Sequence, residues 1–380
     1  MLRTRALSAA ALLAVLAGCT GPVTPAPTPA PQRSLVPADV GLLGQDDDLP
    51  RAAPAAEPVQ APDPGPTFPP GARVVGTGTG ASCTSDALAA AVRYGGHVVF
   101  DCGPDPVTIE ITRTLYTCNT TTCDHLWKGG SPVEALVVDG GGLVTLSGGG
   151  RRGIYYANSC EESLGWLGEA CQEEARPHVT FTDITFVDGN AQGPPDGFDG
   201  VGPGAGGAIL MRGGRLTLDG ATFRGNRCVT ADSDAGGGAV RVVGMPAGAT
   251  ITDSLFDGNA CANGGAISAL HAPLTITGSR IIGNNATGSG ASSGNGGNGG
   301  GVYFDGTNQD VVIRGTTISG NVAPEGGPAI FYVSNDHTGT LTIEDSVLTG
   351  NTGQRFHTDP YRSIYYLGRG EIRVSGSTVD

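Results

Sequence analysis

One repeat of the chain reads ATITDSLFDGNACANGGAIS over residues 249–268. Its apolar residues Ala249 and Ile251 alternate with threonines, Phe256 follows a tight turn, and a third apolar segment begins at Ala266 after two glycines. Alternation with a period of two indicates a short strand with one face turned inward. The stretch therefore predicts three short strands separated by three turns.

The same pattern recurs along the chain wherever the dipeptide Gly-Asn occurs. Apolar residues lie ten, eight and three positions before five of these asparagines, and the first copy fits with one extra residue. Self-similarity at intervals of about 25–37 residues is typical of solenoids. The anchoring asparagines are Asn190, Asn226, Asn259, Asn284, Asn321 and Asn351.

Three strands and three turns in each repeat predict a coil, and stacked coils form a parallel β-helix. Stacking buries each inward side chain against its equivalents in the neighbouring coils, which gives a continuous core. Longer repeats differ mainly between Gly-Asn and the following Gly-Gly pair. The insertions should therefore emerge from one edge of the helix, where repeat proteins often carry specificity.

The N-terminal residues predict export and a lipid anchor. Arg3 and Arg5 precede a short apolar run that ends in Leu-Ala-Gly-Cys at residues 16–19, which resembles the lipobox of bacterial lipoproteins. We expect a signal peptide over 1–18, a lipid on Cys19, and a proline-rich tether over 19–70. The folded domain should span 71–380, with its repeats clearest over 179–380, on the cell surface or outer membrane.

Composition limits the classes of partner. The net charge is −14 and Lys128 is the only lysine, so the chain lacks the basic face that nucleic acid requires. A short helix is predicted over 85–94, where Thr84 or Ser85 is the N-cap and two glycines end it. This helix should cap the open end of the solenoid.

The repeats resemble a known family. Gly-Gly-Ala-Ile at 206–209 and 264–267, with Phe-Arg-Gly-Asn at 223–226, is similar to the GGAI and FxxN repeats of polymorphic outer-membrane proteins, within the pectin-lyase-like superfamily. The resemblance implies an all-β, right-handed parallel β-helix that is exposed on the surface and often adhesive. It covers roughly residues 179–351, but several copies have Ile or Leu in place of Phe.

The cysteines fit an oxidising compartment, because eight remain beside Cys19 and can pair completely. Cys228 and Cys261 each lie two residues after a repeat asparagine in consecutive copies. Adjacent rungs are about 4.8 Å apart, which a disulfide accepts, so these two should staple neighbouring coils. Proximity in sequence adds three weaker pairs: Cys83–Cys102, Cys118–Cys123 and Cys160–Cys171.

The repeated polar residues have a structural interpretation. A stacked asparagine ladder satisfies backbone groups from rung to rung. Asp183, Asp253 and Asp345 share a register with glycines of other copies, as a turn of fixed backbone geometry requires. No cofactor is predicted, although loop carboxylates offer a weak Ca²⁺ alternative. The Ca²⁺ candidates are Asp196, Asp199, Asp232 and Asp234.

No catalytic signature of polygalacturonases or pectate lyases is found, and neither His178 nor His271 has a neighbouring partner in sequence. We therefore predict a non-catalytic surface lipoprotein that binds a glycan, another protein or its own kind. The alternative is a polysaccharide lyase or glycoside hydrolase acting on acidic polysaccharide. An arginine, Arg212, Arg241 or Arg314, beside an acidic cluster in one cleft would favour the enzyme.

Overall fold

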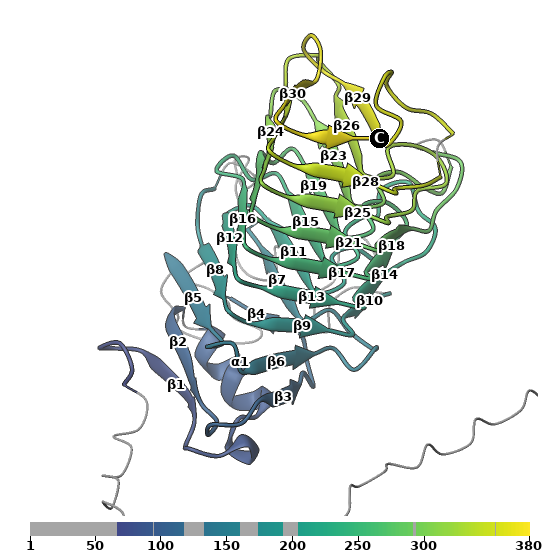
Figure 1. Cartoon of the computed structure of the whole chain (residues 1–380). Coiled ribbons are helices and arrows are strands. Elements are labelled where there is room, and N and C mark those ends of the chain that lie inside the picture. Colours follow the sequence, from purple (N-terminus) through teal and green to yellow (C-terminus); the bar gives the residue numbers. More distant parts are fainter. Residues whose placement is uncertain are drawn as a thin grey trace, which may run out of the picture. The chain divides into compact units, whose positions relative to one another are not determined.

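The structure, a computed structural model, describes residues 67–93, 95–117, 133–159, 174–192, 204–291, 294–353 and 355–380, which belong to one compact unit. Its named strands form four stacks, and every pairing between them is parallel (Figure 1). Each coil passes from a ten-stranded sheet to a nine-stranded sheet, then to an eight-stranded sheet, and back. The architecture is a right-handed parallel β-helix, as the sequence predicts.

The strands of each sheet follow one another in coil order. The ten-stranded sheet consists of β1 (Arg73–Gly76), β2 (Gly96–Asp101), β5 (Ala135–Asp139), β8 (His178–Thr182), β12 (Arg215–Asp219), β16 (Ala249–Thr252), β20 (Leu274–Thr277), β24 (Val311–Arg314), β27 (Leu341–Glu344) and β30 (Arg373–Ser375). The nine-stranded sheet consists of β3 (Val107–Glu110), β6 (Val144–Ser147), β9 (Thr185–Val187), β13 (Thr222–Arg224), β17 (Leu255–Asp257), β21 (Arg280–Ile282), β25 (Thr317–Ser319), β28 (Val347–Thr349) and β31 (Thr378–Val379).

The third sheet closes the coil, and a short fourth sheet lies beside the insertions. The eight-stranded sheet consists of β4 (Leu115–Tyr116), β7 (Tyr155–Asn158), β11 (Ile209–Arg212), β15 (Val240–Val243), β19 (Ile267–Leu270), β23 (Val302–Gly306), β26 (Ile330–Ser334) and β29 (Ile364–Leu367). The four-stranded sheet consists of β10 (Asn190–Ala191), β14 (Arg227–Cys228), β18 (Ala260–Cys261) and β22 (Asn285–Ala286).

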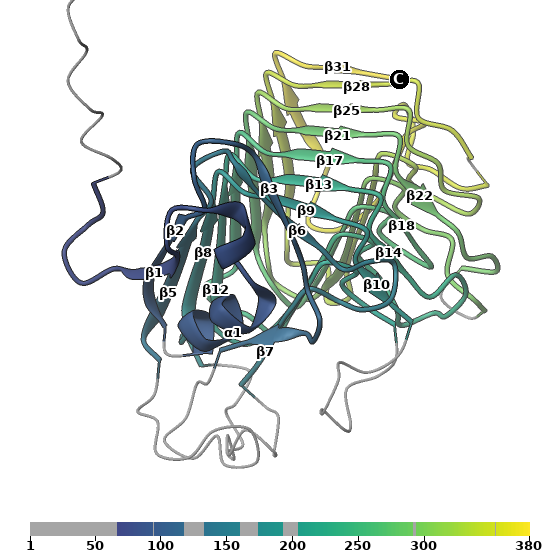
Figure 2. The same cartoon turned by 90° about the horizontal axis from the view of Figure 1, so that it is seen from below.

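The N-terminal end is closed by the helix α1 (Ser85–Arg93), which follows a one-turn 3-10 helix over Gly80–Ser82 (Figure 2). Thr84 is its N-cap, since its hydroxyl oxygen accepts from the backbone N–H of Ala87. Leu88 and Val92 of α1 are buried in the core. The capping helix expected from sequence is therefore present. None of the helices in the described ranges has the length and apolar character needed to cross a membrane.

The core is a column of inward side chains that repeat at fixed register. Phe186, Phe223 and Phe256 stack with ring centroids 4.8 Å apart and nearly parallel planes, and all three are fully buried. Ile281 and Ile318 continue this column in the next coils. Contact between like residues buries apolar area in every coil.

An asparagine ladder runs beside the core. From Asn259 onward, each buried asparagine in it accepts, through its side-chain Oδ1, from both the backbone N–H and the side-chain Nδ2 of the asparagine one coil earlier. The distances are 2.9–3.0 Å throughout. Each Nδ2 also donates to a backbone carbonyl, so both donor hydrogens are used in the amides of all ladder members before Asn351. The ladder members are Asn226, Asn259, Asn284, Asn321 and Asn351.

Asn190 does not belong to the ladder, which corrects the sequence prediction. The extra residue of the first copy shifts the register, so Asn190 pairs with Arg227 and Gly189 occupies the ladder position. The backbone N–H of Gly189 donates to Oδ1 of Asn226 at 2.9 Å. A Cβ at Gly189 would lie 2.2 Å from the carbonyl oxygen of Gly207, so no side chain fits at the ladder position in this coil.

A second ladder, of hydroxyl groups, occupies the turn between the ten-stranded and nine-stranded sheets. Here the side-chain oxygen of each residue accepts from the backbone N–H one coil earlier, at 3.0–3.3 Å. The accepting residues are Ser254, Ser279, Thr316, Ser346 and Ser377. Sequence analysis missed this ladder, although Ser or Thr five residues before the repeat asparagine was the signal for it.

The turn that carries these hydroxyls needs a left-handed residue. Asp183, Asp253 and Asp345 have φ of 46°, 47° and 49°, and glycines fill the same register with φ of 53–61°. Asp tolerates this conformation better than most residues. The repeat aspartates are therefore structural, as predicted.

Two disulfides join parts of the described chain, and both match pairings expected from sequence. Cys228–Cys261 links neighbouring coils with a Cα–Cα distance of 4.7 Å, and Cys83–Cys102 ties the segment before α1 to the end of β2 at 5.7 Å. Residues Ala235 and Ala262 pack around Cys228 and Cys261 in a small separate cluster. The Cys228–Cys261 disulfide therefore holds the start of the insertion 229–239 to the neighbouring coil.

Replacing Asn259 by alanine tests the ladder. The change leaves the backbone N–H and the amide of Asn226 without an acceptor in the interior, so we expect the free energy of unfolding to fall by about 3–5 kcal/mol. Denaturant titration measures it. Asn285→Ala is the matched control, because that exposed neighbour should change stability by less than about 0.5 kcal/mol. Equal effects of the two variants would contradict the ladder's role.

Removing the inter-coil staple with Cys228→Ala and Cys261→Ala together should lower the free energy of unfolding by about 3–4 kcal/mol, because a loop of 33 residues then opens in the unfolded chain. The same titration with and without reductant measures this effect. In reductant, the parent chain and the double variant should become equally stable, because Cys83–Cys102 is open in both and the staple is absent from both. A double variant as stable as the parent chain would show that the staple adds nothing.

Candidate functional site

From β10 onward, the long insertions lie on one edge of the helix, before the eight-stranded sheet, whereas the connections 117–134 and 159–177 lead from the eight-stranded to the ten-stranded sheet. Residues 229–239 connect β14 to β15, and residues 287–301 connect β22 to β23. Turns from the ten-stranded to the nine-stranded sheet span only two residues in these coils, as at 253–254 and 278–279. The variable edge expected from sequence is present, and it overlies the outward side of the eight-stranded sheet.

An aromatic column forms part of that outward side. Tyr303, Phe331 and Tyr365 occupy one register, with successive ring centroids 5.1 and 4.9 Å apart, and Phe356 packs edge-on against Tyr365 at 5.1 Å. Tyr303 and Phe331 are each 7% exposed, whereas Tyr365 and Phe356 are partly accessible. The accessible end of the column therefore lies in the C-terminal coil.

Arg241 lies on the same outward row, between Leu210 and Ser268, and is 8% exposed. Its Nη1 donates to the hydroxyl oxygen of Ser268 at 3.2 Å. Burial lowers the pKa of Arg241, and the negative charges of Asp232 and Asp234 act in the opposite direction. An arginine thus lies near an acidic cluster, but it is covered by the insertion and does not line an open cleft.

The other two arginines are placed differently. Arg314 forms an exposed ion pair with Glu344, Nε to Oε2 at 2.5 Å, on the ten-stranded sheet. Arg212 lies on the eight-stranded sheet beside Val243 and is half-buried. Within the described ranges, these arginines do not form the arginine and carboxylate cleft that would favour an enzyme.

The Ca²⁺ candidates divide into two groups. The carboxylate of Asp232 already makes hydrogen bonds within its own loop, where Oδ1 accepts from the backbone N–H groups of Asp234 and Ala235 at 2.7 and 3.2 Å. Asp196 and Asp199 lie outside the described residues. No group of three or more His, Cys, Asp or Glu residues that could hold a metal ion occurs in the described part of the chain.

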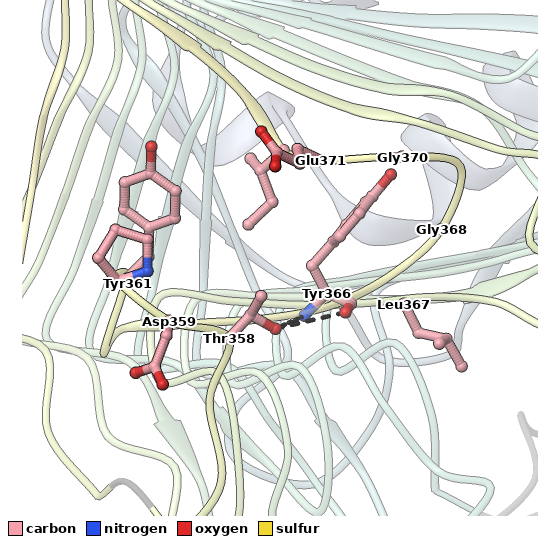
Figure 3. A pocket seen from close by; sticks show the side chains of 10 residues that line it. Thr358, Asp359, Tyr361, Tyr366, Leu367, Gly368, Gly370 and Glu371 are labelled. Carbon is pink, nitrogen blue, oxygen red and sulfur yellow. Dashed lines mark hydrogen bonds between the residues drawn. The ribbon is translucent and has the colours of Figure 1, made fainter.

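A pocket of about 410 Å³ opens in the C-terminal coil, between the segment 358–361 and the turn 366–372 (Figure 3). The rings of Tyr361 and Tyr366 stand on different sides of it, and the carboxylate of Glu371 lies between them in this view. Its volume falls within the range of small-molecule sites. Tyr366 is the last member of a column in the core: its ring stacks on Tyr332 at 5.2 Å and the residue is 9% exposed, whereas Tyr361 is half-buried. Two aromatic side chains and a carboxylate acceptor in one pocket suit a hydroxylated, weakly polar ligand.

The two walls of this pocket are held together by Thr358. Its hydroxyl accepts from the backbone N–H of Tyr366 at 2.9 Å and donates to the carbonyl oxygen of the same residue at 3.3 Å. The backbone N–H of Thr358 also donates to the carbonyl of Ile364 at 2.8 Å. This local clamp positions the tyrosines before any ligand arrives.

Asp359 stands at the rim of the pocket. Its side chain is 93% exposed, and Oδ1 lies 3.0 Å from Nε2 of His357. In Figure 3 its carboxylate points away from that of Glu371. Sequence analysis missed this pocket, and the only signal was the group of tyrosines and acids in 359–371 after the last full repeat.

Several predicted sites lie outside the described residues. Cys19, with the signal peptide and tether, is one of them, and so are the pairs Cys118–Cys123 and Cys160–Cys171. Of the two histidines considered, His178 contacts the hydroxyl of Thr217 through Nε2 at 3.0 Å, and desolvation lowers its pKa. His271 is exposed in a turn with φ of 50°. Neither forms a pair typical of catalysis.

Comparison with known families matches residues 143–379 to a family described as right-handed β-helix region. Because the match covers more than half of the chain, the chain belongs to the right-handed β-helix family, within the pectin-lyase-like superfamily. Comparison with curated proteins and with solved structures found no match. The fold serves surface or structural proteins and pectin-lyase-like enzymes, so the site must distinguish them.

Proposed function

We propose that this chain is a lipid-anchored, extracytoplasmic binding protein that captures a glycan in the pocket of its C-terminal coil. The observation that carries the proposal is the pairing of two tyrosine rings, Tyr361 and Tyr366, with the carboxylate of Glu371 around one cavity. Sugar rings present apolar faces that pack on aromatic rings, and their hydroxyls donate to carboxylates. The partly exposed Tyr365 and Phe356 extend the aromatic surface next to it.

Charge favours a neutral glycan. The chain carries −14, and both acidic side chains of the pocket, Asp359 and Glu371, are exposed to solvent. A uronate carboxylate would be repelled at close range unless a divalent cation bridged it. A binding assay should therefore compare neutral with acidic polysaccharides, each with and without Ca²⁺.

The alternative function is glycoside hydrolysis. A specific observation favours it, because two carboxylates line one pocket and glycosidases use such a pair as acid and base or nucleophile. Against it, the carboxylate of Asp359 points away from that of Glu371 and its side chain is 93% exposed, so the two carboxylates do not flank one position in the pocket. The binding function therefore fits this geometry better.

The binding proposal predicts that the purified chain co-elutes with a neutral polysaccharide of unchanged length in size-exclusion chromatography. Glu371→Gln combined with Asp359→Asn should weaken binding about 10-fold to 100-fold, the loss of one charge-assisted hydrogen bond. Asp105→Asn, an exposed acid in the N-terminal coils, is the control and should bind like the parent. Shortened glycan would establish the hydrolase instead, and absence of any co-elution would overturn glycan capture.

The lipid anchor is tested separately. Cys19→Ala should abolish incorporation of a labelled fatty acid and shift the chain from the membrane fraction to the soluble fraction of expressing bacteria, because the chain then lacks its acylated cysteine. Cys83→Ala is the matched control, since it alters a cysteine without touching the N-terminus. A Cys19→Ala chain that still incorporates the label would disprove the anchor.

A further inference from the structure

A repeated Thr-x-Thr motif lies on the outward side of the ten-stranded sheet. Thr180 and Thr182 in β8, Thr250 and Thr252 in β16, and Thr275 and Thr277 in β20 belong to it, and Thr217 in β12 fills the coil between. The strand pairings place all of them in two straight rows across four consecutive coils. We name this surface the threonine face.

The hydroxyls of this face are available to a ligand. Thr217 contacts Nε2 of His178, but the hydroxyls of Thr250, Thr252, Thr275 and Thr277 make no hydrogen bond to the protein within the described residues. Every one of these threonines is partly exposed. Thr250, Thr252, Thr275 and Thr277 therefore each offer a methyl group and a free hydroxyl at a fixed position.

The threonine face carries few charges, although the chain as a whole carries −14. The row that contains Thr217 has no charged residue from Val137 through Thr342. The parallel row carries Asp219 within the four coils, and the exposed Arg215 lies beside Thr217 on the same side of β12.

The turns that leave the threonine face for the nine-stranded sheet are two residues long. The connections that enter β12, β16 and β20 from the eight-stranded sheet are also short, at 213–214, 244–248 and 271–273, whereas the longer connection 159–177 leads into β8. In the coils of β12, β16 and β20 the face therefore has short turns at both edges, which leaves room for an extended surface.

Strand propensity alone does not account for this arrangement. Threonine is favoured on exposed strands everywhere, so both outward sheets should be equally rich in it. The nine-stranded sheet does have one such row, with Thr108, Thr145, Thr185 and Thr222 in its first four coils. Its second outward row reads Glu110, Ser147, Val187 and Arg224 in the same coils. Among the described strands, two adjacent rows rich in threonine are therefore found on the ten-stranded sheet.

The spacing of the rows fits a lattice of water. Neighbouring coils are about 4.8 Å apart, and alternate residues of a strand are about 6.7 Å apart. In ice, each water has four tetrahedral hydrogen bonds of about 2.76 Å, which places second-neighbour oxygens about 4.5 Å apart and gives a repeat of about 7.4 Å along the hexagonal axis. The spacing between coils exceeds the second-neighbour distance by about 0.3 Å, so the difference reaches only about 1 Å across four coils.

We propose that the threonine face binds the surface of an ice crystal. Its hydroxyls continue the hydrogen-bonded lattice, while its methyl groups fill the spaces between ordered waters. The occupant should be periodic in two directions, because the rows of threonine are, and should bind mainly through hydroxyl and methyl groups, because Asp219 is the one charged side chain within the two rows of these four coils. A crystalline polysaccharide meets both conditions, but the face has no aromatic ring for sugars to pack on, so ice is the better match. This activity is independent of the glycan pocket.

The test is the shape and recrystallisation of ice in solutions of the purified full chain. We expect faceted crystals and inhibited recrystallisation. Thr250→Tyr and Thr275→Tyr should each abolish both effects, because a bulky ring lifts the flat face off the lattice. The control is Thr222→Tyr on the nine-stranded sheet, which should keep full activity and shows that the solenoid tolerates an outward tyrosine.

A gain-of-function variant makes the test sharper. Asp219 is the one charged residue within the two rows of these four coils, at the position where the other coils have threonine. Asp219→Thr completes the motif and should lower the concentration needed to inhibit recrystallisation. Unshaped ice with the parent chain, or equal losses from Thr222→Tyr and Thr250→Tyr, would overturn the proposal. Adsorption to crystalline cellulose or chitin without any effect on ice would also overturn it.

Discussion

The structure depends on one constraint, that equivalent residues of successive coils stay in register. The asparagine ladder enforces it from the side of the nine-stranded sheet, because each amide bonds both the backbone and the side chain of its neighbour. The amide is buried, so a slip by one residue would leave several donors without partners. The phenylalanine column and the hydroxyl ladder reinforce the same register.

Rigid register explains how the functional surfaces arise. A side chain placed once on an outward strand is placed again about 4.8 Å away in the next coil, which produces the aromatic column and the threonine face. Where the chain leaves the coil it is free to vary, so insertions and the C-terminal pocket provide unique geometry. The repeated surfaces suit periodic ligands, and the pocket suits a single sugar unit.

Much of the fold could be predicted from sequence because the repeat is encoded locally. Phe256, Asn259 and the glycines at 264–265 define a coil without any long-range information, and Cys228 and Cys261 share a register visible by counting. The position of Asn190 could not be predicted, since only the pairing with Arg227 reveals the shift. The pocket was also hidden, because Tyr361 and Tyr366 face one cavity only after the turn between them closes.

The most direct test of glycan capture is a crystal structure of the chain with a soluble neutral oligosaccharide. The account predicts a sugar ring held between Tyr361 and Tyr366, with a hydroxyl donating to the carboxylate of Glu371. An oligosaccharide bound elsewhere on the solenoid, with this pocket empty at saturating concentration, would contradict it.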